Sequence, residues 1–255
     1  MKLPLGEIYK KCRSYNDQPG VNSYLLHPQK GSCYDGLLLP IQVVQIGNGR
    51  RTLLATYGCH GNEIASAQSF LHSIRNILKQ NLAQNVTYIG VLLNPEGVMH
   101  GHRSLNPFDK KNDMNRDWQT LAFSYTRCGR QFIDRVLKKN HPDSFLHLDH
   151  HEDRTNKSYF LSGRNENIGQ QITDRMKRLG KNVFNTKADE SLETLCQHIE
   201  ECGFNSLCFE TGRVVDIGGF FSSLLPMPAK KLSERINLHV LADEIALRIL
   251  AEKMY

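Results

Sequence analysis

The sequence predicts an α/β protein, a three-layer α/β/α domain with a mixed, largely parallel central sheet. Strand-like apolar runs alternate along the chain with segments in which apolar residues recur at the helical period. Several of these runs end in residues that can do chemistry, as expected at the carboxyl ends of parallel strands, where ligands bind in such sheets. The sequence shows no repeat, low-complexity segment or linker, so we expect residues 1–255 to form a single domain.

In the first half of the chain, turn signals separate the predicted elements. Residues 97–117 have no periodicity and predict a long polar loop, which in a compact domain is usually functional or disordered. The turn signal Asn94-Pro95 ends the last strand before this loop. The predicted elements are strands at 36–46, 51–57 and 86–93 and a helix at 64–79.

The second half of the chain continues the alternation. Gly180 and Gly203 are predicted to end two helices, because glycine accepts the left-handed conformation that often follows a helix. The apolar stripe of the last helix, which includes Ile236 and Leu250, is most simply explained by core packing. The predicted elements are helices at 127–139, 168–179, 191–202 and 233–253 and strands at 144–149, 159–161 and 206–210.

The composition is that of an ordinary soluble protein of 29.1 kDa, with 40% hydrophobic and 23% charged residues. The formal net charge is +6 and the pI about 8.9, but the lysines and arginines are scattered among acidic residues. This pattern is typical of a solvated surface and argues against nucleic acid as a partner.

Cysteine usage and the N-terminal residues bear on the compartment. Seven cysteines, an odd number without Cys-x-x-Cys pairs, favour neither a disulfide framework nor a cysteine-only zinc knuckle, so a reducing compartment fits best. The first residues lack the apolar segment of a signal peptide, and no run of about 18 apolar residues could span a membrane. We therefore expect a cytoplasmic protein with no membrane partner, and the sequence leaves its oligomeric state open.

Polar residues follow three of the predicted strands. His60 and Glu63 come after the second strand, His150 and His151 come after the strand that follows the long loop, and Glu210 ends the last strand. A polar turn explains any one of these sets alone. It does not explain why all three sets should meet at one edge of a parallel sheet.

Residues of these types can form a catalytic zinc site. Such a zinc ion takes three nitrogen or oxygen ligands and keeps an open position for water, and two histidines with one carboxylate are a common set. His60 and Glu63 can supply two ligands, and His151 or His150 the third. Glu210 can then act outside the ligand set as a general base and acid.

The predicted loop at 97–117 carries cations that suit a carboxylate-bearing substrate. Hydrolysis next to a free carboxylate needs one cation to hold that carboxylate and another to stabilise the oxyanion. Arg103 and the Asn115-Arg116 pair lie in this loop, between the two halves of the candidate metal site.

Six segments between about residues 50 and 215 occur in a recognisable order. They are His60-Gly61-Asn62-Glu63, Asn94-Pro95-Glu96-Gly97, Arg103, Asp113-Met114-Asn115-Arg116-Asp117-Trp118, Asp149-His150-His151 and Phe209-Glu210. In this order they resemble the zinc carboxypeptidases of the carboxypeptidase A type. The wider superfamily includes bacterial murein-peptide amidases and the aspartoacylase and succinylglutamate desuccinylase deacylases. Six ordered matches are far more specific than His-x-x-Glu alone.

The resemblance implies one zinc ion per chain, with His60 and Glu63 as two of its ligands. The family pattern of an aspartate, an apolar residue and a histidine points to His151 as the third ligand, with His150 as the alternative. Asp149 either orients a ligand histidine from outside the ligand set or is a turn residue.

The resemblance also implies roles for the remaining residues. Arg103 would polarise the scissile carbonyl, and Asn115 and Arg116 would bind the substrate carboxylate. Glu210 would be the general base and acid. The implied activity is hydrolysis of an amide bond next to a free carboxylate in a small peptide, as in a metallocarboxypeptidase or small-peptide amidase.

Two departures from the family pattern bear on the substrate. No tyrosine occurs between Tyr159 and Tyr255, so the substrate-capping tyrosine of digestive carboxypeptidases has no counterpart. Only 45 residues follow Glu210 (255 − 210), too few for the C-terminal β-domain of the aspartoacylases, which favours a minimal peptidase-type domain. An N-acyl amino acid deacylase is the alternative within the same chemistry, and a non-catalytic binding protein on the same fold is the second alternative.

Overall fold

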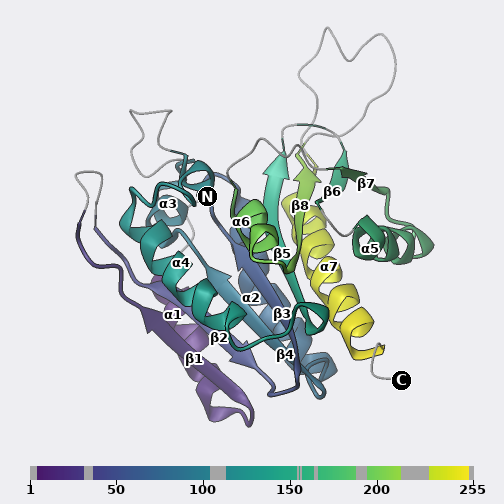
Figure 1. Ribbon diagram of the computed structural model, residues 1–255, viewed down its shortest axis with the longest axis horizontal. Helices are drawn as coiled ribbons and strands as arrows, with labels where there is room; N and C mark the ends of the chain where they lie inside the picture. Colours follow the sequence, from purple (N-terminus) through teal and green to yellow (C-terminus); the bar gives the residue numbers. More distant parts are fainter. Residues whose placement is uncertain are drawn as a thin grey trace, which may run out of the picture.

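The computed structural model describes residues 5–31, 37–103, 113–153, 155, 157–163, 166–187, 194–213 and 230–252. In this part of the chain an eight-stranded sheet is covered by helices on both faces (Figure 1). The arrangement confirms the predicted three-layer α/β/α fold with a mixed, largely parallel sheet.

Strands and helices alternate through most of the described chain. The strands are β1 (Val21–Leu26), β2 (Ile41–Ile46), β3 (Arg51–Tyr57), β4 (Val86–Leu92), β5 (Phe145–Asp153), β6 (Ser158–Ser162), β7 (Val183–Lys187) and β8 (Asn205–Gly212). The helices are α1 (Leu5–Ser14), α2 (Ile64–Gln80), α3 (Pro95–His100), α4 (Ser124–Leu137), α5 (Glu166–Arg178), α6 (Leu195–Glu201) and α7 (Leu232–Glu252). Three short 3-10 turns are η1 (Tyr15–Asp17), η2 (Met114–Arg116) and η3 (Pro142–Ser144).

The strongly periodic segments lie where the sequence predicts them, and β3 and α2 match the predicted ranges to within one residue. Three predictions were wrong in extent. Residues 37–40 are not part of the first predicted strand, since β2 begins at Ile41; β5 continues through Asp153; and α3 begins at Pro95 where a turn and loop were expected. The elements α1, β1 and β7 were not predicted. Residue 36 of the first predicted strand, residues 104–112 of the loop and the start of the helix at 191–202 lie outside the described residues.

The strand order is β1-β2-β4-β3-β5-β8-β6-β7. The four central strands, β4, β3, β5 and β8, run parallel to one another. Antiparallel pairings of β1, β2 and β6 extend the sheet on either side of them. Since parallel strands end at the same edge, the carboxyl ends of β3, β5 and β8 meet in space.

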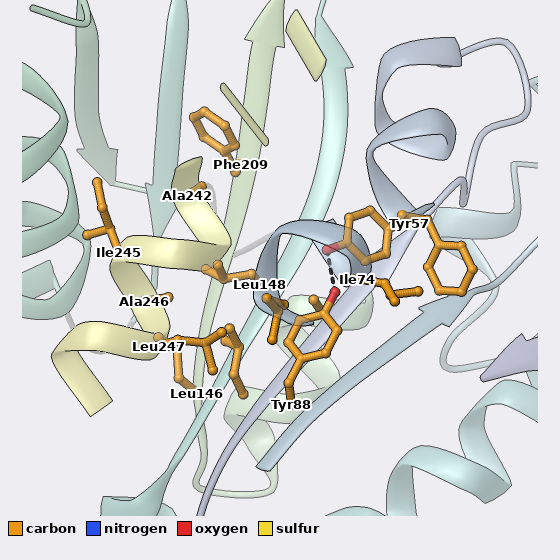
Figure 2. Close-up of a cluster of buried hydrophobic side chains, with 14 of the residues drawn as sticks. Tyr57, Ile74, Tyr88, Leu146, Leu148, Phe209, Ala242, Ile245, Ala246 and Leu247 are labelled. Carbon is orange, nitrogen blue, oxygen red and sulfur yellow. Dashed lines mark hydrogen bonds between the residues drawn. The ribbon is translucent and has the colours of Figure 1, made fainter. Parts of the chain in front are cut away.

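Two apolar clusters hold the layers together. One cluster joins α4, α6 and Trp118 to one face of the sheet, and the other joins α1, α2, α5 and α7 to the opposite face. In the second cluster Leu146 and Leu148 of β5 and Phe209 of β8 gather with Ala242, Ala246 and Leu247 of α7 (Figure 2). The final helix therefore packs on the core, as its apolar stripe predicts.

A buried carboxylate on α7 ties this helix to the strands and to α2. Asp243 accepts hydrogen bonds from Tyr57 of β3, from Ser73 of α2 at 2.5 Å and from His150 of β5 at 2.8 Å. The Tyr57 hydroxyl also shares a hydrogen bond of 2.7 Å with Tyr88 of β4 (Figure 2). Because a buried charge without partners is costly, these donors fix where α7 docks.

We expect Asp243→Ala to lower the free energy of unfolding by about 3–5 kcal/mol, because the change breaks a buried charged network. Urea denaturation measures the difference. The control on the same helix is Glu252→Ala, whose exposed carboxylate pairs with Arg175 and should contribute less than about 1 kcal/mol. Equal losses in the two variants would show that the buried network does not hold α7.

Candidate metal centre and active site

The candidate site lies where the central parallel strands end. β3 ends at Tyr57, and the chain passes through His60 and Glu63 before α2 begins at Ile64. β5 and β8 run side by side, with His151 opposite Glu210 in their register. The sheet therefore brings together residues from segments that lie far apart in the sequence.

Close backbone packing shapes the turn after β3. A Cβ atom at Gly61 would come within 1.8 Å of the carbonyl carbon of Gly97, so only glycine fits at this contact. Asn94 fixes the contact from the other side: its side chain donates to the carbonyl oxygen of Cys59 at 3.1 Å and accepts from the N–H of Gly97 at 2.8 Å. The Asn-Pro-Glu-Gly segment therefore holds the turn in place.

Three side chains at this edge can hold a metal ion. The ligand atoms of His60, Glu63 and His151 lie within 4.8 Å of one another, and all three residues are buried. Nδ1 of His60 is 2.7 Å from Oε1 of Glu63, and Nδ1 of His151 is 2.9 Å from Oε2 of the same carboxylate. Two imidazole nitrogens and a carboxylate thus converge on one point, a donor set that suits zinc and related divalent ions.

The second nitrogen of each histidine faces a further carboxylate. Nε2 of His60 is 2.7 Å from Oδ1 of Asp113, and Nε2 of His151 is 3.0 Å from Oδ2 of Asp149. Metal-binding histidines commonly donate their other N–H to a carboxylate, which fixes the tautomer and leaves Nδ1 free to bind the metal. The residues present therefore fit a metal site in both the ligands and their supports.

The electrostatics of the group also favour a cation. Burial lowers the pKa of His60, but Glu63 and Asp113 outweigh it and raise that pKa. Burial likewise lowers the pKa of His151, and Asp149 with Glu63 raises it well above its ordinary value. The surroundings thus stabilise positive charge at the two imidazoles, so a divalent ion that displaces their protons would meet a matching environment.

A buried hydrogen-bonded chain extends from His151 into the sheet. Thr56 donates to Oδ1 of Asp149 at 2.6 Å and lies 2.9 Å from Nε2 of His147. Nδ1 of His147 is in turn 2.7 Å from the hydroxyl of Ser206 on β8. Because the Thr56 proton goes to Asp149, Nε2 of His147 is the donor to the Thr56 oxygen. This chain positions the carboxylate that orients His151.

The neighbouring histidine points the other way. Since successive strand residues face opposite sides of a sheet, His150 lies on the α7 face, where Nε2 is 2.8 Å from Asp243 and Nδ1 is 2.9 Å from Nδ1 of His239. The structure thus brings His151 into the donor group and places the alternative ligand, His150, in the buried network under α7.

Glu210 faces the same side of the sheet as His151 but stands apart from the three donors. Within the described chain its one hydrogen bond from a side chain comes from Sγ of Cys208, 3.8 Å from Oε1. Burial raises the pKa of Glu210 to about 7, against the opposing effect of His151. A carboxyl group with such a pKa can exchange a proton near neutral pH.

Arg103 lies against the donor group. Its Nη1 donates to Oε1 of Glu63 at 3.2 Å and its Nη2 donates to Oδ2 of Asp113 at 3.1 Å. The side chain is 49% exposed, so one side of the guanidinium group faces solvent. Arg103 is therefore placed to donate to an oxygen that arrives beside Glu63.

Asn115 and Arg116 lie beside Asp113 in the turn η2. The N–H of Asn115 donates to Oδ1 of Asp113 at 2.9 Å, and its side-chain oxygen accepts from the N–H of Leu195 at 3.5 Å. Nη1 of Arg116 donates to the Asn115 carbonyl oxygen at 3.3 Å, and no ion pair to Arg116 occurs among the described residues. The guanidinium group of Arg116 is exposed and can bind an anionic ligand by donating hydrogen bonds to it.

Residues 49–223 match the family model of the succinylglutamate desuccinylase/aspartoacylase catalytic domain. The chain belongs to this family. The match spans every residue of the site described above and agrees with the superfamily that the motif order resembles. No curated protein matches the chain in sequence.

Several solved structures of other proteins have a fold similar to that of this chain. A metallo-carboxypeptidase from Burkholderia cenocepacia has a TM-score of 0.73 at 15% identity, covering 100% of this chain and 70% of that one. Bovine thrombin-activatable fibrinolysis inhibitor, in complex with tick carboxypeptidase inhibitor, has a TM-score of 0.71 at 13% identity, covering 100% and 99%. A metallo-carboxypeptidase from Pseudomonas aeruginosa, in complex with (2-guanidinoethylmercapto)succinic acid, has a TM-score of 0.63 at 16% identity, covering 98% and 69%. At these identities the likeness is one of fold.

The sequence analysis assigned no role to two residues at the site, Asp113 and Glu152. Asp113 was noted only as part of a motif, because its partner His60 is 53 positions away. Glu152 had no assigned role. Its Oε2 accepts from the N–H of Ala65 at the start of α2, at 2.8 Å, and its Oε1 pairs with Arg235 of α7. Glu152 therefore holds helices in place and is not free to act as a base.

Among the described helices, none combines the length and the apolar character that a membrane span requires.

We expect a graded loss of zinc binding when this group is altered. His151→Ala removes a donor and should weaken zinc affinity by more than about a hundredfold, whereas Asp113→Asn removes only a supporting bond and should cost about 10–100-fold. His150→Ala should keep the affinity but lower the free energy of unfolding by about 1–3 kcal/mol, since Asp243 loses a donor. Zinc titration and urea denaturation of the three variants give these values, and loss of zinc in His150→Ala would reassign the ligand.

The raised pKa of Glu210 predicts a pH-dependent effect on stability. The folded pKa of about 7 lies above the ordinary value of 4.5, so the folded protein binds this proton more tightly than the unfolded chain. Its stabilising contribution is complete below pH 4.5 and is lost as pH rises towards 7. In chelator, Glu210→Gln should therefore gain stability relative to the unmodified protein over this window, reaching about 1–3 kcal/mol.

Urea denaturation at several pH values tests this expectation, and Glu244→Gln is the matched control. Burial raises the pKa of Glu244, but hydrogen bonds from Asn76, Arg248 and Gln80 outweigh it and lower that pKa. The same substitution should there lose stability as pH rises through the acidic range. A gain in Glu210→Gln that does not change with pH would mean that the carboxyl does not titrate as described.

Proposed function

We propose that this chain is a zinc-dependent hydrolase that cuts an amide bond next to a free carboxylate, as a metallocarboxypeptidase or small-peptide amidase. The observation that carries the proposal is the convergence of His60, Glu63 and His151, each histidine backed by a carboxylate, beside the separate carboxyl group of Glu210. Three ligands and one base outside the ligand set are what a hydrolytic zinc site requires. We take residues 1–255 as one catalytic domain that binds one zinc ion.

His60, Glu63 and His151 would hold the zinc ion. When bound, zinc polarises a carbonyl group and lowers the pKa of water to about 7. Asp113 and Asp149 would keep Nδ1 of each histidine aimed at the ion by accepting from Nε2. The low exposure of all three ligand residues supports this role, because it excludes competing water from the ligand side.

Glu210 would move the protons. Its carboxylate would accept a proton from the attacking water and return it to the nitrogen of the leaving amine. The pKa of about 7 supports this role, since both protonation states are accessible near neutral pH. The position of Glu210 opposite His151 across β5 and β8 puts it next to the donors without making it one of them.

Arg103, Asn115 and Arg116 would position the substrate. Asn115 and Arg116 would bind the free carboxylate of the substrate, and Arg103 would donate to the scissile carbonyl oxygen as negative charge develops there. The exposed side of Arg103 and the lack of an ion pair to Arg116 among the described residues support these assignments.

A second candidate is an N-acyl amino acid deacylase, and the family model favours it because that family is described by two deacylases. The same ligands, base and carboxylate-binding residues would serve this reaction, since an N-acyl amino acid also presents an amide bond next to a carboxylate. A non-catalytic binding protein is less well supported, because the ligands and Glu210 are all present.

A panel of peptides and N-acyl amino acids, assayed with zinc, tests the proposal and separates the two hydrolases. We expect about one zinc ion per chain by metal analysis and hydrolysis of at least one carboxylate-bearing class. Glu210→Gln should keep the zinc but lower kcat by at least about a hundredfold, as expected for loss of a positioned acid and base.

Arg116→Ala is the comparison variant. Because it removes a contact made in both the ground state and the transition state, it should raise KM more than it lowers kcat. Absence of stoichiometric zinc binding, or full activity in Glu210→Gln, would rule out this mechanism.

A further inference from the structure

Two cysteines meet on the α6 face of the sheet, next to the candidate base. Cys196 is the second residue of α6, and Cys208 lies on β8, two residues before Glu210 and therefore on the same face of the strand. Helix α6 packs on β8, and each of the two thiols is a hydrogen-bonding partner of the other. A helix and the strand that follows it thus bring two sulfur atoms into contact.

Cys208 links this pair of thiols to Glu210. Its Sγ lies 3.8 Å from Oε1 of Glu210, and in the described part of the chain no other side chain donates a hydrogen bond to that carboxyl group. Because Cys208 has a single S–H, this proton serves either Glu210 or Cys196. A chemical change in the pair therefore reaches the candidate base directly.

The surroundings of Cys196 favour its thiolate. Its sulfur contacts His147 as well as Cys208. The hydrogen bonds with Cys208 and His147 lower the pKa of Cys196 below its ordinary value, although burial opposes them. The bond to Cys196, together with burial, raises the pKa of Cys208 well above its ordinary value. Since the thiolate is the nucleophilic form of cysteine, Cys196 is the sulfur that reacts first.

The other described cysteines differ from this pair in exposure or in partner. Cys196 and Cys208 are both partly exposed, whereas Cys59 is buried. Cys202 is more exposed than either, but its sulfur lies 3.8 Å from Nε2 of His198. A small reagent in solution can therefore reach a pair of sulfurs that are already in contact.

We propose that Cys196 and Cys208 form a redox-active modification site, in which hydrogen peroxide or another small peroxide joins the two sulfurs in a disulfide bond and removes the S–H beside Glu210. Because the sulfurs already touch, closing them to the bond length of about 2.05 Å needs only a small shift. Formation of the bond is independent of the proposed function, whereas its effect on turnover rests on that function.

The oxidation takes two steps. The Cys196 thiolate attacks one oxygen of the peroxide, the O–O bond breaks, and the departing hydroxide takes up the proton that the thiol released, which leaves a sulfenic acid on Cys196. Cys208 then attacks that sulfur: the S–S bond forms, the S–O bond breaks, and the hydroxide leaves as water with the Cys208 proton. Two thiols are thereby oxidised to one disulfide while one peroxide is reduced to two water molecules.

Mass analysis of the zinc-loaded protein before and after treatment with hydrogen peroxide tests the site. Cleavage after Glu201 and Phe204 separates Cys196, Cys202 and Cys208 into different peptides. We expect the loss of two hydrogen atoms, a link between the Cys196 and Cys208 peptides, and full reversal by dithiothreitol.

Three serine variants sharpen this test. Cys196→Ser should form no link, and Cys208→Ser should instead accumulate a sulfenic acid on Cys196, because no second sulfur is left to displace the hydroxide. Cys202→Ser is the matched control from the same segment and should form the link as the unmodified protein does. A link that involves Cys202, or oxidation of Cys202 before the pair, would overturn the proposal.

Turnover measures the effect on Glu210. The oxidised enzyme should keep its zinc, since no candidate ligand is a cysteine, and should lose kcat by about fivefold or more, the effect of one lost hydrogen bond. Reduced Cys196→Ser should keep kcat within about twofold of the unmodified protein and should not respond to peroxide.

Unchanged kcat in protein that carries the disulfide, or equal inactivation of Cys196→Ser by peroxide, would overturn the link between the pair and Glu210. Loss of zinc on oxidation would overturn it as well, because the damage would then lie at the donors. If no substrate is hydrolysed at all, the hydrolase proposal fails, and the mass analysis still decides whether the disulfide forms.

Discussion

The alternation of side chains along β5 is the constraint on which the rest of the site depends. This strand is buried on both faces, yet it carries ionisable residues at successive positions near its carboxyl end. Asp149 and His151 face one side of the sheet, and His150 and Glu152 face the other. Because buried ionisable groups are stable only with partners, each face must recruit its own set from distant parts of the chain.

The two faces meet this requirement in different ways. On the α7 face Asp243 accepts hydrogen bonds from Tyr57, Ser73 and His150. Glu152, on the same face, accepts from the N–H of Ala65 and pairs with Arg235, so both carboxylates have their partners within the protein. On the α6 face the balance is reversed, since three carboxylates surround two histidines. They are Glu63, Asp113 and Asp149, around His60 and His151.

An excess of carboxylates favours added positive charge, and the raised pKa values of the two histidines express this. The same argument explains the contrasting state of Glu210. It lies close to the group but outside its hydrogen bonds, so burial dominates and raises its pKa. Position relative to one cluster thus separates carboxylates that are held ionised from one that can exchange a proton.

Much of the fold followed from the sequence because the central elements have strong periodicity. β3, α2 and α7 carry apolar patterns that local sequence reveals. His60 and Glu63 follow the predicted strand β3, and Glu210 lies near the carboxyl end of the predicted strand β8. The peripheral strands β1 and β7 were missed because they are only partly buried, which weakens their apolar pattern. The length of β5 was underestimated because charged residues continue a strand whose partners are supplied from elsewhere.

The pairings within the site could not be predicted from local patterns. The contact of Asp113 with His60 joins η2 to the turn after β3, and the chain from Asp149 through Thr56 to His147 runs between two strands. Such contacts depend on strand order and register, which no local window of sequence specifies. Motif order indicated which residues belong to the site, whereas the fold assigned Asp149 and Glu152 to their different partners.

The site also divides into a fixed part and a part that can vary. The donors restrain one another through bonds that begin in the strands, so a change at His151 would disturb Asp149 and the buried chain behind it. The guanidinium group of Arg116 has no such tie, since within the described chain it makes one hydrogen bond, of 3.3 Å, to the carbonyl oxygen of Asn115. Under the proposed function, a substitution at Arg116 would change which anions are recognised while leaving the donor geometry intact. A fold that fixes its donors in strands and holds Arg116 in the turn η2 can therefore change substrate without rebuilding its chemistry.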